Sequence, residues 1–181
     1  MAEAGLPGLR AMPLEEACER LRPPLVAAWG CWERSAGTAH APSDWYRLLV
    51  TALQAEARTA EQAVALAAFC LSEQPTIPTR EALVALASEP APRVLQRFAA
   101  LVDDGRLQTP ETANRWLGTL RQHFRDTEGL RGRAVMDPLR AALTGNMAGP
   151  CLGNVTSLLG AERCRQRALA ALAVLNAPER D

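Results

Sequence analysis

Apolar residues recur along this chain with the period of an α-helix. After Ser43, a residue type favoured at helix N-caps, four apolar residues fall at positions i, i+3, i+4 and i+7. They are Trp45, Leu48, Leu49 and Ala52. No segment alternates apolar and polar residues for long enough to predict a strand. We therefore expect an all-α fold built from short helices.

Proline and glycine divide this pattern into separate helices. The Pro23-Pro24 pair is predicted to interrupt a first helix, and Gly105 is predicted to close the helix that follows Pro92. The clearest start is Thr109-Pro110-Glu111, which places a cap residue, a proline at the first helical position and an acid in the first turn. Later helices are predicted over residues 136–143, 150–159 and 161–175.

All twenty basic residues are arginine, and this excludes several kinds of function. A Walker-type phosphate loop and a Schiff-base enzyme both require lysine. The five cysteines are widely spaced and have only two histidines to join them, so we expect no metal and no cofactor. No run approaches the roughly 18 apolar residues of a membrane helix. The odd cysteine count and the polar N-terminus predict a cytoplasmic protein.

The formal net charge of zero hides a difference between two parts of the chain. Residues 1–105 hold nine arginines and thirteen acidic residues, whereas residues 106–167 hold ten arginines and five acidic residues. We expect a flexible N-terminal arm over residues 1–12, where periodicity is absent. An N-terminal helical lobe over residues 13–105 and a C-terminal helical lobe over residues 106–181 would follow.

The helix predicted after Thr109 carries Arg121 and Arg125 opposite its apolar stripe, and a turn with Arg131 and Arg133 follows. Arginines gathered on one lobe are the usual electrostatic footprint of a phosphate-backbone partner. A solvated helix face has the same appearance. The charge pattern alone therefore leaves both interpretations open.

The stretch from Gly132 to Gly145 reads GRAVMDPLRAALTG. It resembles a segment near the end of bacterial glutamyl-tRNA synthetases that is usually written G-[KR]-x-L-[FY]-x-P-L-R-x-A-L-T-G. The likeness continues through Gly149-Pro150 and through LLG at residues 158–160, followed by Glu162-Arg163. Upstream, the similarity is thinner but in the same order. It extends over nearly the whole chain after about residue 13 and corresponds to the anticodon-binding region of that family.

The resemblance implies a two-lobed α-helical cage that grips the anticodon stem-loop of a tRNA, which in that family accepts glutamate. A separate Rossmann domain activates the amino acid there, and its His-x-Gly-His and lysine-dependent signatures are absent from this chain. We therefore expect a stand-alone tRNA-binding module that is not an enzyme and has no catalytic residues. A fragment of a full synthetase remains the other interpretation.

Several positions depart from the family pattern. The family's Q-E-R-x-K-T-L reads QAEARTA over residues 54–60, so that Glu56 stands where the resemblance associates an arginine with reading the first anticodon base. A negative charge beside RNA costs binding free energy, which argues against base reading by the N-terminal lobe. Ala148 replaces the family's histidine before Gly-Pro, and Met136 replaces an aromatic residue, whereas Arg140 is retained.

We predict RNA contacts from seven residues of the C-terminal lobe. They are Arg121, Arg125, Arg131, Arg133, Arg140, Thr144 and Gly145. The arginines would contact phosphates or stack on unpaired bases. A structural role is the alternative for Arg140, as an ion pair with an acid such as Glu162, and for Thr144 and Gly145, as a helix end with positive φ. The alternative function is an adaptor that binds a protein partner through the acidic N-terminal lobe.

Overall fold

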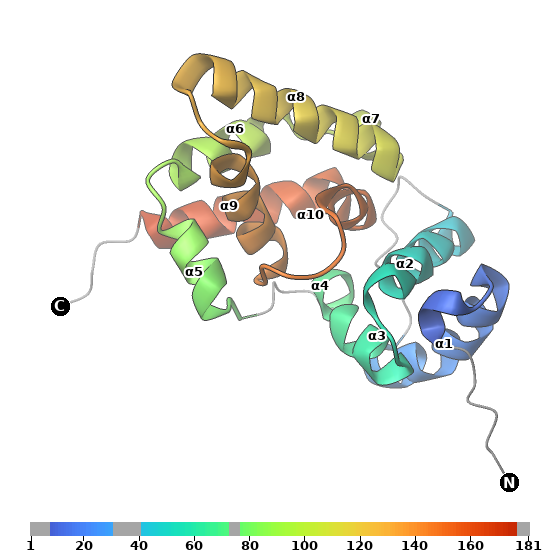
Figure 1. Ribbon diagram of the computed structural model, residues 1–181. Helices are drawn as coiled ribbons and strands as arrows, with labels where there is room; N and C mark the ends of the chain where they lie inside the picture. Colours follow the sequence, from blue (N-terminus) through green and yellow to red (C-terminus); the bar gives the residue numbers. More distant parts are fainter. Residues whose placement is uncertain (1–7, 31–40, 73–76, 177–181) are drawn as a thin grey trace, which may run out of the picture.

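The computed structural model describes residues 8–30, 41–72 and 77–176, and all regular secondary structure in these ranges is helical (Figure 1). The all-α prediction is confirmed. The elements are η1 (Leu9–Ala11), α1 (Leu14–Trp29), α2 (Pro42–Glu56), α3 (Ala60–Leu66), α4 (Ala68–Leu71), α5 (Arg80–Leu86), α6 (Ala91–Leu101), α7 (Asp104–Leu107), α8 (Pro110–Glu128), α9 (Gly132–Thr144) and α10 (Leu152–Leu175).

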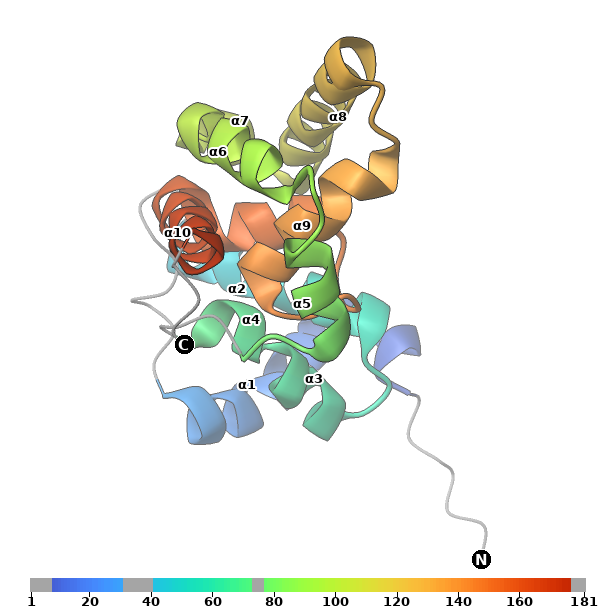
Figure 2. The same ribbon diagram turned by 90° about the vertical axis from the view of Figure 1, so that its left-hand side faces the viewer.

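Helix α10 is the element around which the others are arranged. It packs against α6, α8 and α9, and it also contacts α2, α4 and α7. Helix α9 packs against both α10 and α5, while α1, α2 and α3 contact one another (Figure 2). In both views α8 lies at one end of the molecule and α1 and α3 lie at the opposite end.

Buried side chains connect segments that are distant in sequence. Trp45 on α2 is fully buried, and its indole Nε1 donates to the carbonyl of Leu158 on α10 at 2.9 Å. Near the N-terminus, Gln54 donates to the carbonyls of Leu9 and Met12, both at 2.9 Å. Leu9 and Met12 are themselves buried, so the flexible arm expected over residues 1–12 does not include them. Residues 1–7 of that arm lie outside the described ranges.

Threonine N-caps begin three helices, including the one whose start is predicted at Thr109. The hydroxyls of Thr59, Thr79 and Thr109 each accept from a backbone N–H three residues later. At α8, the Thr112 hydroxyl also accepts from the Thr109 N–H at 3.0 Å, which completes a capping box. Two otherwise unpaired N–H groups are thereby satisfied at the start of the helix.

The Pro23-Pro24 pair does not interrupt the first helix, contrary to the prediction, because α1 continues through it to Trp29. Each proline lacks an N–H, which deprives the carbonyls of Glu19 and Arg20 of their helical donors. Both of those residues are exposed, so water can bond the two carbonyls at low cost. The part of the predicted second helix beyond Gly30 lies outside the described residues.

Gly105 does not close the helix that follows Pro92, because α6 ends at Leu101 and Gly105 lies inside α7. The carboxylate of Asp103 accepts from the Arg106 N–H at 3.0 Å and so starts α7. Helix α9 begins at Gly132, earlier than the predicted residue 136. The predicted break between the last two helices is confirmed as a kink in α10, where Gly160 has φ 75°.

Arg167 on α10 is buried, and its guanidinium forms no ion pair with the described residues. It donates instead to the carbonyls of Phe69, Ser72 and Leu143, at the C-terminal ends of α4 and α9. Such carbonyls have no intrahelical donor and carry partial negative charge, so they can take the place of an acid. Burial, together with a smaller effect of the nearby charge of Arg163, lowers the pKa of Arg167 to about 10.

The lobe boundary expected between residues 105 and 106 stays a prediction. Helices α5 and α6 precede it in the sequence, yet α9 and α10, against which they pack, follow it. The contacts of α5 and α6 therefore cross the expected boundary.

Candidate nucleic-acid interface

Three of the predicted arginines meet in one cavity, which we call the basic pocket. Its volume is about 420 Å³, and it is lined by Arg121, Gln122, Arg125, Gly129, Leu130, Arg131 and Gly132. Arg121 and Arg125 lie near the end of α8, and Arg131 is the residue before the first residue of α9. A helix end and the turn after it therefore bring together side chains separated by up to ten positions.

The turn at Gly129 gives the basic pocket its shape. Gly129 has φ 66°, a left-handed conformation that residues other than glycine seldom adopt. Its N–H donates to Arg125 and the next N–H donates to Phe124, which satisfies carbonyls at the end of α8. The chain then returns so closely that a Cβ atom on Gly132 would lie 3.2 Å from Cδ of Arg121.

The guanidinium groups of Arg121, Arg125 and Arg131 are exposed and form no hydrogen bond or ion pair with any described residue. The same is true of Arg133, which lies on the first turn of α9 but does not line the basic pocket. Nearby acids have other partners, since Glu128 pairs with Arg93 and Asp126 accepts from Gln122. The pocket therefore presents positive charge to the solvent.

Arg140 lies away from the basic pocket and is half-buried. Its Nη1 donates to the carbonyl of Pro150 at 2.9 Å, across the segment that joins α9 to α10. The ion pair with Glu162 that was considered as the alternative for Arg140 does not form, and Glu162 pairs with Arg165. Burial lowers the pKa of Arg140, and the nearby acids Asp137 and Glu56 partly oppose that effect.

Thr144 and Gly145 form the end of α9. The Thr144 hydroxyl lies 2.8 Å from the carbonyl oxygens of Arg140 and Asn146, and it accepts from the Asn146 N–H at 3.1 Å. Gly145 has φ 71°, as expected for a glycine that ends a helix, and its carbonyl accepts from the Thr79 N–H at 2.9 Å. Both residues are buried and shape the segment that follows.

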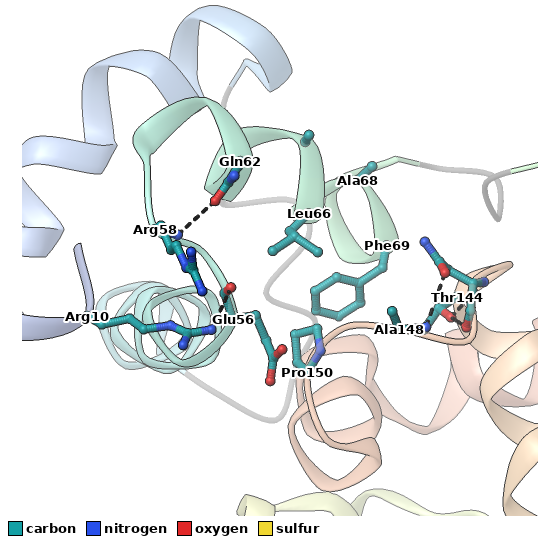
Figure 3. A pocket seen from close by; sticks show the side chains of 12 residues that line it. Arg10, Glu56, Arg58, Gln62, Leu66, Ala68, Phe69, Thr144, Ala148 and Pro150 are labelled. Carbon is teal, nitrogen blue, oxygen red and sulfur yellow. Dashed lines mark hydrogen bonds between the residues drawn. The ribbon is translucent and has the colours of Figure 1, made fainter. Parts of the chain in front are cut away.

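Thr144 also lines a second and larger cavity, the interhelical cleft, whose volume is about 630 Å³. One wall comes from η1 and from the region of α2, α3 and α4, and the other comes from the segment after α9 (Figure 3). The lining residues are Arg10, Glu56, Arg58, Gln62, Ala65, Leu66, Ala68, Phe69, Thr144, Asn146, Ala148 and Pro150. Phe69, Leu66 and Pro150 form its apolar part.

Charged groups from two elements enter the interhelical cleft. Arg10 donates from Nη2 to the backbone carbonyl of Glu56 at 3.0 Å, and Arg58 is held nearby by its N–H, which donates to Gln62 at 2.9 Å. Figure 3 shows the Glu56 carboxylate between these arginines and Pro150. The carboxylate forms no hydrogen bond or ion pair with the described residues.

Arg10 and Arg58 are not among the site residues predicted from the sequence. Arg58 offers a signal, since it occupies the lysine position of the Q-E-R-x-K-T-L pattern. Arg10 offers none, because only the packing of η1 against α2 brings it to the cleft. Within residues 8–30, 41–72 and 77–176, no group of three histidine, cysteine or acidic side chains could hold a metal ion. No helix in these ranges is both long and apolar enough to cross a membrane.

The described part of the chain is an all-α domain with an exposed cluster of arginines around the turn between α8 and α9. The chain is a member of the anticodon binding domain family, which it matches over residues 16–172. The resemblance to the anticodon-binding region of glutamyl-tRNA synthetases is thereby confirmed.

Individual relatives agree with this assignment. The chain is 30% identical over 165 residues to a glutamate–tRNA ligase of Thermus thermophilus, a match that spans 90% of the chain and 31% of the ligase. It is 30% identical over 116 residues to that of Heliobacterium modesticaldum, covering 64% of the chain and 23% of the ligase. A crystal structure of a glutamate–tRNA ligase from Elizabethkingia meningosepticum shares the fold, with a TM-score of 0.72 at 17% identity over 93% of this chain and 30% of the ligase.

Proposed function

We propose that this chain is a tRNA-binding module that grips the anticodon stem-loop and does not itself charge tRNA. The basic pocket carries the proposal, because Arg121, Arg125 and Arg131 converge there without an acidic partner among the described residues. A guanidinium offers parallel N–H donors that match the oxygens of a phosphate. The names of the relatives, which are glutamate–tRNA ligases, support tRNA as the polyanion.

The seven predicted residues would then differ in how they contribute to RNA binding. Arg121, Arg125, Arg131 and Arg133 would contact phosphates, since their charges face the solvent. Arg140 and Gly145 would act indirectly, because both hold the segment that forms one wall of the interhelical cleft. Thr144 lines that cleft and would border any base that enters it. Phosphate contacts position an RNA, and contacts in the cleft would supply discrimination.

A non-catalytic role is supported by the extent of the match. The chain spans 31% and 23% of the two ligases described above, and it contains no lysine for a synthetase signature loop. We expect that the purified chain does not catalyse glutamate-dependent exchange of pyrophosphate into ATP. Exchange above a protein-free blank would contradict this part of the proposal. A tRNA ligand would also place the chain in the cytoplasm.

The RNA-binding part is tested by the salt dependence of affinity for a tRNA anticodon stem-loop hairpin. If three phosphates are neutralised, the logarithm of affinity should fall with the logarithm of salt concentration at a slope of roughly −0.7 per single-strand phosphate, about −2 in total. Replacing Arg121 and Arg125 with glutamate should weaken all hairpins alike and flatten the slope. Fluorescence anisotropy at several salt concentrations measures both quantities.

The matched control is a double replacement of Arg20 and Arg97 with glutamate. It changes the net charge by the same amount as the Arg121 and Arg125 replacements, at positions on α1 and α6 that line neither cavity. Its salt slope should stay that of the unmodified chain. If the two double variants lose the same amount of hairpin affinity, binding depends only on the net charge of the chain and not on the basic pocket. If the unmodified chain shows no salt-sensitive binding to tRNA even at low ionic strength, the RNA proposal fails and the adaptor hypothesis remains.

A further inference from the structure

The first turn of α9 adds positive charge to the basic pocket besides that of its three arginines. Gly132, the first residue of α9, lines the pocket. The N–H groups of Gly132 and Arg133 donate to no described residue, as is usual for the first N–H groups of a helix. No acid lies in this turn, and the N-cap residue Arg131 offers no side-chain acceptor. Such N–H groups attract anions.

The end of α8, on the other side of the basic pocket, does not cancel this charge. The last carbonyls of a helix carry partial negative charge. Two of them, those of Phe124 and Arg125, already accept from the N–H groups that follow the helix. No acidic residue is among the described residues that line the pocket. A ligand there therefore meets three guanidinium groups and a helix N-terminus.

This concentration of positive charge fits a more highly charged group than one phosphate of an RNA backbone. Each backbone phosphate carries a single negative charge, and a sugar separates it from the next. A terminal phosphate carries roughly −1.5 to −2 at neutral pH, and in a diphosphate a second phosphoryl group is joined directly to it. Each guanidinium can donate two parallel N–H bonds to such oxygens. The pocket volume of about 420 Å³ also lies within the roughly 300–1,000 Å³ of small-ligand sites.

We infer that the basic pocket also binds the diphosphate group of a free nucleotide, which then competes with RNA for the same arginines. The diphosphate lies between Arg131 and the two arginines of α8, beside the N-terminus of α9. The nucleoside contributes little, because only Gln122 and Leu130 remain among the lining side chains to contact it. The pocket shares no lining residue with the interhelical cleft. The competition, unlike the diphosphate site itself, rests on the proposed RNA-binding function.

The test measures how inorganic diphosphate, ADP and orthophosphate bind to the full chain, by isothermal titration calorimetry. Divalent cations are left out and the ionic strength is held constant. Diphosphate and ADP should bind with similar affinity, each roughly fivefold more tightly than orthophosphate, which is the upper value for one additional exposed ion pair. Binding of ADP without binding of inorganic diphosphate would show that the nucleoside is recognised, and would overturn the inference.

Arg121→Gln and Arg131→Gln each remove one guanidinium, from opposite sides of the basic pocket. Each should weaken diphosphate binding by roughly fivefold. Arg115→Gln is the matched control, since Arg115 is exposed on the same helix as Arg121 and does not line the pocket. It should keep the affinity, and all three variants should keep the melting temperature of the unmodified chain. Equal losses of affinity in the three variants would show attraction to net charge alone and overturn the inference.

Competition is measured by adding inorganic diphosphate to the complex with an anticodon stem-loop hairpin, again at constant ionic strength. Diphosphate should displace the hairpin from the unmodified chain. If the hairpin binds with its salt slope and no diphosphate binds, the inference fails and the RNA proposal stands. If diphosphate binds and no hairpin does, the diphosphate site stands and the RNA proposal fails. Diphosphate that binds without displacing the hairpin overturns the competition.

Discussion

Arginine has two opposite roles in this chain, and burial decides between them. Arg121 and Arg125 keep their guanidinium groups in solvent, where they are available to a phosphate. Arg140 and Arg167 place theirs among backbone carbonyls of the chain itself. A single sequence does not distinguish the two roles, because each arginine lies on a helix with helical apolar spacing. The alternative considered for Arg140, an ion pair with an acid, differs from the observed contact for this reason: its partner is a carbonyl, which every residue possesses.

Replacing Arg140 with alanine removes the donor to the Pro150 carbonyl. We expect a loss of about 1.5–3 kcal/mol in the free energy of unfolding, the range for a hydrogen bond that involves a charged group. At this chain length the melting temperature should fall by about 2–4 °C per kcal/mol. Selectivity among RNA hairpins should be retained if Arg140 only positions the segment after α9.

Thermal denaturation and hairpin affinity measure the two effects separately. Arg133→Ala is the control, since Arg133 is exposed and its guanidinium bonds to no described residue, and it should leave the melting temperature unchanged. An Arg140→Ala variant with an unchanged melting temperature and reduced discrimination would instead indicate direct contact with a base.

Among the helices, the boundaries that depend on local chemistry could be predicted and those that depend on the surroundings could not. The Thr109 cap rests on a side-chain hydroxyl, and the Gly145 end and the Gly160 kink rest on the backbone freedom of glycine. The continuation of α1 through Pro23 depends on whether the carbonyl of Glu19 is exposed. That is a property of the folded chain and is not visible in the sequence.

Thr109→Ala tests the strongest of the predicted helix starts. The variant loses the hydroxyl that accepts from the Thr112 N–H, whereas the Thr112 hydroxyl can still accept from the backbone N–H of residue 109. The free energy of unfolding should decrease by about 1 kcal/mol, within a range of roughly 0.5–2 kcal/mol. Thr119→Ala is the control in the interior of the same helix, where the hydroxyl only bonds back to the Arg115 carbonyl. Urea denaturation measures the free energy of unfolding of both variants. Equal decreases in that free energy would show that the Thr109 cap contributes nothing beyond any threonine hydroxyl of the helix.

At the scale of the whole molecule, the prediction of an all-α fold needed only the apolar period, whereas the two cavities needed the packing of distant elements. The basic pocket is partly local, because Arg121, Arg125 and Arg131 lie around one turn, and sequence analysis selected all three. The interhelical cleft joins segments from η1 to the end of α9. Arg10 enters it only through tertiary packing, which no spacing rule describes.

The buried thiols should make the molecule less stable as the pH becomes alkaline. Burial raises the pKa of Cys70 and of Cys164 from 9.0 to about 12. Above about pH 9 the unfolded chain releases thiol protons that the folded chain retains, so the free energy of unfolding should fall as pH rises toward 12. Each thiol contributes a slope of up to about 1.4 kcal/mol per pH unit.

Urea denaturation on both sides of about pH 9 measures this slope. Replacing Cys70 and Cys164 with alanine should make it shallower, whatever the loss of stability at neutral pH. Replacing the exposed Cys151 with alanine should leave the slope as it is. A double variant with the slope of the unmodified chain would show that the two thiols do not cause the pH dependence.

The buried guanidinium of Arg167 has a consequence for the interhelical cleft. It bonds to the carbonyl of Phe69, which lies on one wall, and to that of Leu143, the neighbour of Thr144 on the other wall. The rigid, planar guanidinium of Arg167 thus fixes the distance between the two walls of the interhelical cleft. An entering ligand meets a preorganised gap, so the entropy cost of fixing its width falls on folding and not on binding.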